Sequence, residues 1–330
     1  MSTAVPNNGG SAVATAKNAH TAKDATAETA TRPARATGAS PFTDIAPGRK
    51  RTNAIMGGLM WLCMILALIP LVWVLWTVIS RGIGPITSGD WWTKDQGMTT
   101  PLLPGGGAFH AIVGTLLQTL IASLFSIPIG VFTAIYLVEY SNGSRLGKLT
   151  TFMVDILSGV PSIVAALFIY ALWITILGQE RSGFAVALSL ILLMVPIVVR
   201  NTEEMLRVVP MDLREASYAL GVPKWKTISR IVLPTALSGI VTGIMLAVAR
   251  VMGESAPVLV LVGSTSTTNW NPFSGPMSSL PLMMLDMYKS GTTPNVMDKL
   301  WGAALTLVIL VVVMNILARV VSARYSVKKK

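Results

Sequence analysis

Long apolar segments constrain this 330-residue chain more than any other feature. Most are long enough for the roughly 20 residues that a spanning helix needs. Only 12% of the residues are charged, against about 25% in soluble domains, and 52% are hydrophobic. The sequence therefore predicts an all-α, polytopic membrane protein with six transmembrane helices. We place these spans at about residues 54–79, 111–138, 150–177, 184–199, 235–262 and 300–321.

Basic residues indicate how these spans are oriented. They stand at the ends of the apolar segments and do not alternate with aromatic residues, which favours a lipid partner over nucleic acid. If the N-terminus is cytoplasmic, most of these residues flank the spans on the inner side. The outer flanks then hold only Arg81, Lys94, Arg181, Lys289 and Lys299. We therefore expect a multi-pass protein of the plasma or inner membrane with both termini in the cytoplasm.

Residues 1–48 differ from the rest of the chain. They are rich in Ala, Thr, Ser, Gly and Pro and contain few large apolar groups. Such a segment buries too little surface to offset the cost of ordering, so we predict a disordered cytoplasmic tail. The first apolar segment begins too far along the chain and is too long for a signal peptide, so it is expected to be an uncleaved anchor. Residues 49–330 then form the transmembrane domain.

Neither a metal site nor a catalytic site is predicted. The single cysteine, Cys63, lies in an apolar segment, and His20 and His110 share no ligand spacing with nearby carboxylates. The stretch that comes nearest to a phosphate-binding loop lies at 142–150. Three residues separate Gly143 from Gly147, where such a loop has four, and Leu149 stands where a Ser or Thr is needed. Any nucleotide must therefore bind to a partner.

A polar, basic loop at 201–233 separates the fourth and fifth spans. Asp212 is a candidate N-cap, and Glu215 three positions later approximates a capping box. Gly221 is placed to close this short helix, and Pro234 to begin the next one. The pattern predicts two helices that meet at a fixed bend.

The same loop resembles the signature of permeases from binding-protein-dependent ABC importers. That signature runs Glu-Ala-Ala, three residues, Gly, nine residues, Ile, one residue, Leu-Pro. The matching residues here are Glu215, Ala216, Gly221, Ile231, Leu233 and Pro234, with Ser217 as a small-for-small departure. Residues 159–168, 184–206 and 219–263 are similar to the phosphate-specific members, and the likeness covers roughly residues 50–325.

This resemblance implies a type I ABC importer permease (MetI-like) fold and a non-catalytic subunit that conducts inorganic phosphate. It also implies a second, related permease, two ATP-binding subunits that carry ATP and Mg²⁺, and an extracytoplasmic phosphate-binding protein. The ATP-binding subunits would attach at Glu215–Gly221. Sulfate and molybdate are alternative substrates. An ion-driven secondary transporter is a further alternative, although no inverted repeat with paired broken helices is visible.

Two charged residues, Arg250 and Glu254, lie within the fifth predicted span. Charges there are costly unless paired or facing water, so they are candidates for function. Their spacing of four places them on one face of a helix, where they can pair. A structural ion pair or a lock between permease subunits is one reading. The resemblance favours the other, in which Arg250 contacts phosphate through parallel hydrogen bonds and Glu254 orients it.

Asp155 precedes a break in the third predicted span. Pro161, followed by Ser162, removes a backbone donor and disrupts the helix. Such breaks are tolerated where the backbone is buried or lines a cavity, so these residues either kink the helix for packing or line the pathway. Glu139 and Arg200 fall at span ends and are expected at the membrane interface.

Two long loops are expected on the outer face. Residues 80–110 contain Trp91 and Trp92, and residues 263–299 contain a short amphipathic segment. In that segment four side chains can share one helix face, namely Met283, Met284, Met287 and Tyr288. Packing at the lipid headgroup level and a landing surface for an external partner both explain these residues.

Overall fold

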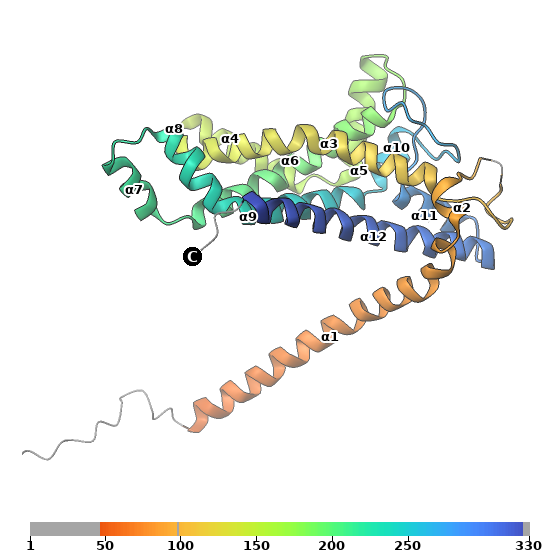
Figure 1. Cartoon of the computed structure of the whole chain (residues 1–330), viewed down its shortest axis with the longest axis horizontal. Helices are drawn as coiled ribbons and strands as arrows, with labels where there is room; N and C mark the ends of the chain where they lie inside the picture. Colours follow the sequence, from red (N-terminus) through yellow and green to blue (C-terminus); the bar gives the residue numbers. More distant parts are fainter. Residues whose placement is uncertain (1–46, 98, 326–330) are drawn as a thin grey trace, which may run out of the picture. The chain divides into compact units, whose positions relative to one another are not determined.

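The computed structural model describes residues 47–97 and 99–325, and these residues are helical almost throughout (Figure 1). Their only strand-like feature is an isolated bridge between Ser182 and Gly275. The all-α prediction is therefore confirmed, whereas the tail predicted at 1–48 lies almost entirely outside the described residues. The long helices are α1 (Pro47–Ile86), α3 (Phe109–Ile135), α6 (Gly183–Val208), α9 (Leu233–Met252) and α12 (Pro294–Tyr325).

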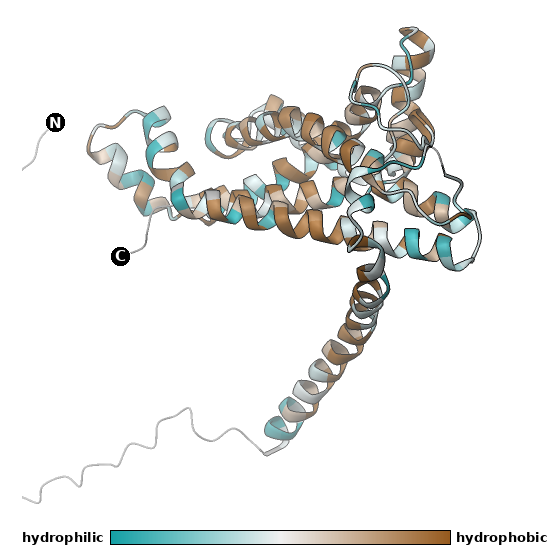
Figure 2. Ribbon diagram, turned by 45° about the vertical axis from the view of Figure 1, so that its right-hand side comes forward, coloured by the Kyte–Doolittle hydropathy of each residue, from teal (hydrophilic) through white to brown (hydrophobic). Residues whose placement is uncertain are grey.

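Shorter elements connect these helices. They are α2 (Gly89–Thr93), α4 (Arg145–Gly159), α5 (Ser162–Ile169), α7 (Met211–Ala219), α8 (Lys224–Thr227), α10 (Ala256–Leu261) and α11 (Leu280–Lys289). Three π-helical turns are η1 (Tyr136–Tyr140), η2 (Tyr170–Ile176) and η3 (Ile228–Val232). Figure 2 shows apolar residues along the long helices, whereas hydrophilic residues gather on the short helices at one end of the bundle.

In the described part of the chain, five helices are long and apolar enough to cross a membrane, or six if the bent pair of α4 and α5–η2 counts as one span. The bent pair corrects the third predicted span, 150–177. Helix α4 and the α5–η2 segment differ in direction by 105°. The cause is local, because Val160 and Pro161 both adopt extended backbone angles and proline cannot donate to the preceding turn.

The fifth predicted span, 235–262, is also interrupted. Helix α9 ends at Met252, and α10 begins at Ala256 after a three-residue break. Pro257 lacks the N–H that a continuous helix would direct to the carbonyl of Gly253, and Gly253 itself favours a helix end. The apolar run therefore forms two helices.

The fourth predicted span, 184–199, is longer in the structure. Helix α6 continues to Val208, so the loop predicted at 201–233 begins only at Val209. Glu203 pairs with Arg200 at 2.8 Å and with Arg207 at 2.6 Å, at spacings of three and four residues. These ion pairs stabilise the polar C-terminal end of α6, which the hydropathy of the sequence does not indicate.

Close contacts between long helices form the core. A Cβ at Gly130 of α3 would lie 2.6 Å from Cγ1 of Val198 in α6. A Cβ at Gly243 of α9 would lie 2.6 Å from Cβ of Asn201 in α6. Small residues let membrane helices approach closely, and dispersion contacts then hold them. The largest buried cluster includes Met194 and Val198 and continues into α9 and α10.

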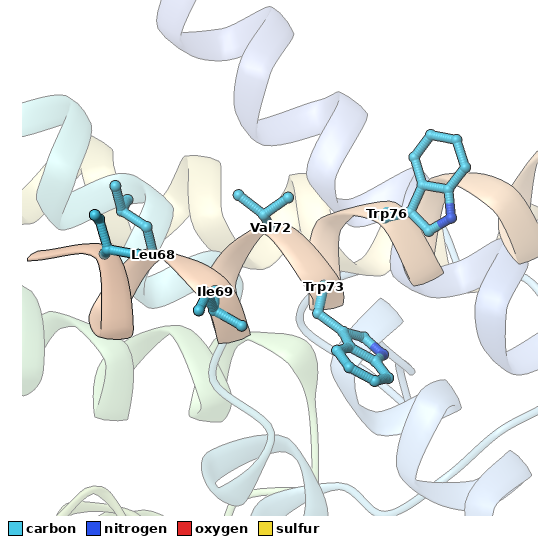
Figure 3. A pocket seen from close by; sticks show the side chains of 6 residues that line it. Leu68, Ile69, Val72, Trp73 and Trp76 are labelled. Carbon is cyan, nitrogen blue, oxygen red and sulfur yellow. The ribbon is translucent and has the colours of Figure 1, made fainter. Parts of the chain in front are cut away.

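The chain divides into two compact units between Cys63 and Met64. In the first unit, residues 47–63 form the start of α1, and apolar side chains such as Trp61 are exposed. In the second unit, Trp73 and Trp76 of α1 are each 72% exposed, and they line a pocket of about 490 Å³ whose side chains all come from α1 (Figure 3). Near its end α1 packs on α12, because Gly82 allows contact with Leu305.

Hydrogen bonds hold the loops and α2 at the end of the bundle away from α7. Their donors include uncharged side chains and a lysine. Trp91 is buried, and its Nε1 donates to Oγ1 of Thr306 at 2.9 Å. Trp91 therefore anchors α2 to α12. This role differs from both expected ones, which were packing at the lipid headgroups and a landing surface for an external partner. The amphipathic segment also differs from its prediction, since Met283 and Met287 of α11 are buried whereas Tyr288 is exposed.

Candidate functional site

Helix α7 begins and ends differently from the predicted capping pattern. Its N-cap is Pro210, so Asp212 lies in the first turn, where its charge complements the helix dipole. The C-terminal end follows the prediction, because Gly221 has φ +72° and the amide of Val222 donates to the carbonyl of Ser217 at 3.2 Å. This 6→1 bond defines a Schellman motif, which requires a left-handed residue at this position.

Ser217 faces inward in this segment. Its Oγ lies 2.8 Å from Oγ1 of Thr227, and both side chains are buried. This hydrogen bond joins α7 to α8 across the turn at Gly221. The small-for-small departure from the permease signature is therefore a buried polar contact, and an alanine would leave the Thr227 hydroxyl without this partner.

Arg214 anchors α7 to the bundle. Its guanidinium Nη2 and Nε lie 3.0 and 3.2 Å from Oε1 of Glu139 in η1, and both side chains are buried. Arg214 also donates to the carbonyls of Leu206 and Val209 at the end of α6, at 2.9 and 2.7 Å. The guanidinium thus satisfies Glu139 and the open end of α6 together.

Lys224 of α8 strengthens the same junction. Its ammonium donates to the backbone carbonyl of Glu139 and lies 5.0 Å from the ring centre of Tyr140. The position of Glu139 at the end of an apolar helix does not by itself predict its partner. The pair with Arg214 joins residues 75 apart in the sequence, and no local pattern links them.

The outer surface of α7 and α8 is exposed. Glu215 and Ala216 of the signature are exposed, as are Leu220 (83%) and Trp225 (64%). Apolar side chains this exposed beside a polar helix indicate a contact surface for another protein. We call the surface formed by Glu215, Ala216, Leu220 and Trp225 the α7 face.

The remaining signature residues lie in a continuous helix. Ile231 is in η3, and Leu233 and Pro234 open α9, but α8, η3 and α9 run without interruption from Lys224 to Met252. The expectation that a helix begins at Pro234 is therefore wrong. The π-helical turn η3 precedes this proline, which has no N–H for the ladder. The bend falls instead at Pro223, the N-cap of α8.

Asp155 belongs to a charged network near this end of the bundle. Asp155 forms an ion pair with Arg200 of α6. Arg200 also pairs with Glu203, and Glu203 pairs with Arg207. Asp155 lines a pocket of about 400 Å³ together with Glu203 and Arg207. Arg200 therefore bridges α4 and α6. Pro161 is the N-cap of α5, and Ser162 is its first residue.

Arg250 and Glu254 do not pair in the structure. The ion pairs found among the described residues do not include either of them, which corrects the expected i,i+4 contact. The reason is that α9 ends at Met252, so Glu254 leaves the helical register of Arg250. Arg250 is exposed in the last turn of α9, at the opposite end of this helix from Pro234.

The signature residues are therefore gathered on one segment, whereas the predicted pathway residues are dispersed. Arg250 lies about 25 Å along α9 from Leu233, at the usual rise of 1.5 Å per residue. Asp155 lies with Arg200, toward the end of α6 that leads into α7. Fold and site together define a class of protein, a multi-pass membrane protein that presents a short, exposed helical segment at one end of its bundle.

Comparison with known proteins identifies the family. Residues 126–327 match the family described as binding-protein-dependent transport system inner membrane component. The chain is 51% identical over 282 residues to "Phosphate transport system permease protein PstA 1" of Mycobacterium tuberculosis (strain CDC 1551 / Oshkosh), which covers 85% of this chain and 91% of the relative. The chain therefore belongs to this family of inner membrane components, in its PstA branch.

Other matches agree with this assignment. The phosphate transport system permease protein PstA of Mycobacterium leprae is 49% identical, with 88% of this chain and 93% of the relative covered. That of Pasteurella multocida is 36% identical, with 82% and 95% covered. A subunit in the crystal structure of a bacterial ABC transporter for alginate import has a TM-score of 0.56 at 14% identity, covering 83% of this chain and 96% of that one, and shares the fold.

Proposed function

We propose that this chain is the membrane subunit of an ABC importer and forms the pathway for inorganic phosphate. The substrate assignment rests on the 51% identity over nearly the whole length of a protein named as a phosphate transport system permease. Sulfate and molybdate have no comparable support among these relatives. The α7 face supports the second part of the proposal, which is coupling to a separate ATPase.

The proposed partners follow from the family. Two ATP-binding subunits, which carry ATP and Mg²⁺, bind the α7 faces of this chain and of a second, related permease. An extracytoplasmic binding protein delivers phosphate at the opposite end of the bundle. In this arrangement α7 and both termini lie in the cytoplasm, and the chain itself catalyses no reaction.

The structure supports a specific route for coupling. The ATPase would contact the exposed Leu220 and Trp225, while the buried Arg214 joins α7 rigidly to Glu139 and to the end of α6. Movement of the α7 face is therefore transmitted to α3 and α6. It also reaches α9 directly, because Lys224–Met252 is one continuous helix of 29 residues. Its far end carries Arg250.

Arg250 and Glu254 are proposed pathway residues, together with Asp155, Pro161 and Ser162. The exposed guanidinium of Arg250 at the end of a membrane helix is suited to a dianion, and it forms no ion pair with another described residue. The break at Gly253 also exposes backbone groups of the kind that line membrane cavities.

Reconstitution tests the function. The chain is purified with its second permease and ATPase, placed in proteoliposomes with the binding protein, and supplied with radioactive phosphate. We expect uptake that requires ATP, that unlabelled phosphate inhibits, and that equal sulfate or molybdate does not. Uptake driven by an ion gradient without ATP would contradict the coupling, and preferential inhibition by sulfate or molybdate would contradict the substrate.

A further inference from the structure

A cavity with several polar side chains in its lining lies between α9 and α12, near the end of the bundle that carries α7. Its volume is about 340 Å³. Figure 1 shows the C-terminal part of α12 beside the first turns of α9 in this region. The polar side chains that line the cavity are Ser238, Thr242, Asn315, Arg319 and Ser322.

These side chains offer several free hydrogen-bond donors. Among the described side chains, those of residues 48–97, 99–320 and 322–324, none forms a hydrogen bond or ion pair with Arg319, and the hydroxyls of Ser238 and Ser322 are likewise unbonded there. Asn315 uses one amide hydrogen on the carbonyl of Val311, at 2.9 Å, and keeps the other. A guanidinium, two hydroxyls and an amide N–H therefore share one cavity.

The charge of this cavity is one-sided. Its lining contains one cation, Arg319, and no carboxylate. Arg200 of α6, by contrast, is balanced by Asp155 and Glu203. Arg319 is exposed near the C-terminal end of α12, so an anion or water can reach its guanidinium. Several hydroxyl and amide donors around an arginine suit a tetrahedral oxyanion, because each oxygen can accept more than one hydrogen bond.

A second cavity continues this one along α9. It also has a volume of about 340 Å³, shares Thr242, Met245 and Asn315 with the first, and reaches Asn201 and Ala249. Ala249 is the neighbour of Arg250. The two cavities thus join the surroundings of Arg319 to those of Arg250 along one face of α9.

We propose that Arg319, with Ser238, Asn315 and Ser322, binds a phosphate oxyanion in the cavity between α9 and α12. Two sources share this chemistry, namely free orthophosphate leaving the pathway and the headgroup of an anionic phospholipid, which basic pockets between membrane helices bind. The orthophosphate source rests on the proposed function, whereas the lipid source does not depend on it.

Ligand titration of the purified complex tests the site and separates the sources. The delipidated complex is titrated with sodium orthophosphate and, separately, with phosphatidylglycerol, and its thermal unfolding is followed. Arg319→Gln is expected to weaken the apparent affinity for one of these ligands at least about tenfold, as the loss of a charge-assisted hydrogen bond requires. A loss confined to orthophosphate identifies the pathway, and a loss confined to phosphatidylglycerol identifies a lipid site.

Arg324→Gln is the matched control, because it removes the same charge from α12 outside the cavity lining. Equal titrations for the wild type and Arg319→Gln, or equal losses in both variants, would overturn the proposal. If the complex with Arg319→Gln does not assemble, the same titrations are done with Ser322→Ala, which removes only one hydroxyl oxygen from the cavity. Absence of phosphate uptake by the wild type, with lipid binding that depends on Arg319, would refute the proposed function alone.

Discussion

The two ends of the helical bundle are held together by different chemistry. Near α7, ion pairs connect the elements, with Arg214 bound to Glu139 and Arg200 bound to Asp155 and Glu203. At the other end the contacts are mostly neutral, as between Trp91 and Thr306 and between the amide of Leu280 and Thr115, 2.9 Å apart. Lys299 at this end donates to the backbone carbonyls of residues 100, 101 and 103, and Lys94 pairs only with Asp90 of its own short segment, at 2.8 Å.

This difference matches the proposed work of each end. Removal of one partner from a buried ion pair is strongly destabilising, because the other charge is left without compensation. A neutral hydrogen bond has no charge for salt to screen. We therefore expect the end proposed to contact the ATPase to respond more strongly to charge substitutions and to salt than the end proposed to meet the binding protein.

The largest effect is expected for Arg214→Met. It leaves Glu139 buried without a cation and frees two carbonyls of α6, so stability should fall by about 3–5 kcal/mol, and phosphate uptake should be lost. Thermal unfolding of the complex and uptake in proteoliposomes measure this. Arg207→Gln is the control, because Arg207 is 66% exposed and its pair with Glu203 is worth about 1 kcal/mol or less.

A paired substitution separates charge from shape in that experiment. Arg214→Met combined with Glu139→Leu removes both charges and should recover much of the lost stability, since a neutral pair has no desolvation penalty. If the double variant is as unstable as Arg214→Met alone, the junction depends on the bonds from Arg214 to α6 and not on the ion pair.

Gly221→Ala should have an intermediate effect, located at the α7 face. An alanine at φ +72° is strained by about 1–2 kcal/mol and distorts the Schellman turn. Gly263→Ala introduces similar strain at φ +79°, with no atom near its Cβ and no place in the coupling segment. The number of phosphates transported per ATP hydrolysed should fall only in Gly221→Ala. Equal ratios in the two variants would contradict the coupling role.

Trp91→Phe should produce a smaller loss at the opposite end. It removes the indole donor to Thr306, whose hydroxyl keeps its own bond to Gly302, so about 1 kcal/mol is expected. Because the contact is neutral, the loss should be the same at low and high salt. Trp92→Phe, at an exposed tryptophan, is the control. A strong salt dependence for Trp91→Phe would erase the contrast between the two ends.

The smallest effect is a pH dependence at Asp95, in a loop at the same end. Burial raises the pKa of this carboxyl, but hydrogen bonds from the amides of Gly97 and Thr268 and from the Thr268 hydroxyl outweigh it, so the pKa is lowered. The stabilisation is therefore present above the unfolded pKa of about 4 and is lost as the pH falls through the folded value. The protection of the Thr268 amide from hydrogen exchange, measured relative to the intrinsic rate at each pH, should fall in acid for the wild type, and Asp95→Asn should remove this acid dependence.

Local sequence accounts for much of the fold and for part of the site. Hydropathy places the long helices because a spanning segment must be apolar over its whole length. Hydropathy fails where backbone chemistry changes inside an apolar run, as at Pro161 and Pro257, and where a helix continues beyond its apolar part, as α6 does to Val208. The signature at Glu215–Pro234 was recognisable because its residues are close in sequence.

The sequence by itself thus determined an all-helical membrane protein, its family and the position of its contact segment, since each follows from local composition or spacing. Only the tertiary structure decided which charges meet. It paired Arg214 with Glu139 across 75 residues, separated Arg250 from Glu254 by ending α9, and brought Arg319 beside Ser238 in one cavity. Such contacts depend on which helices pack together, and no local pattern carries that information.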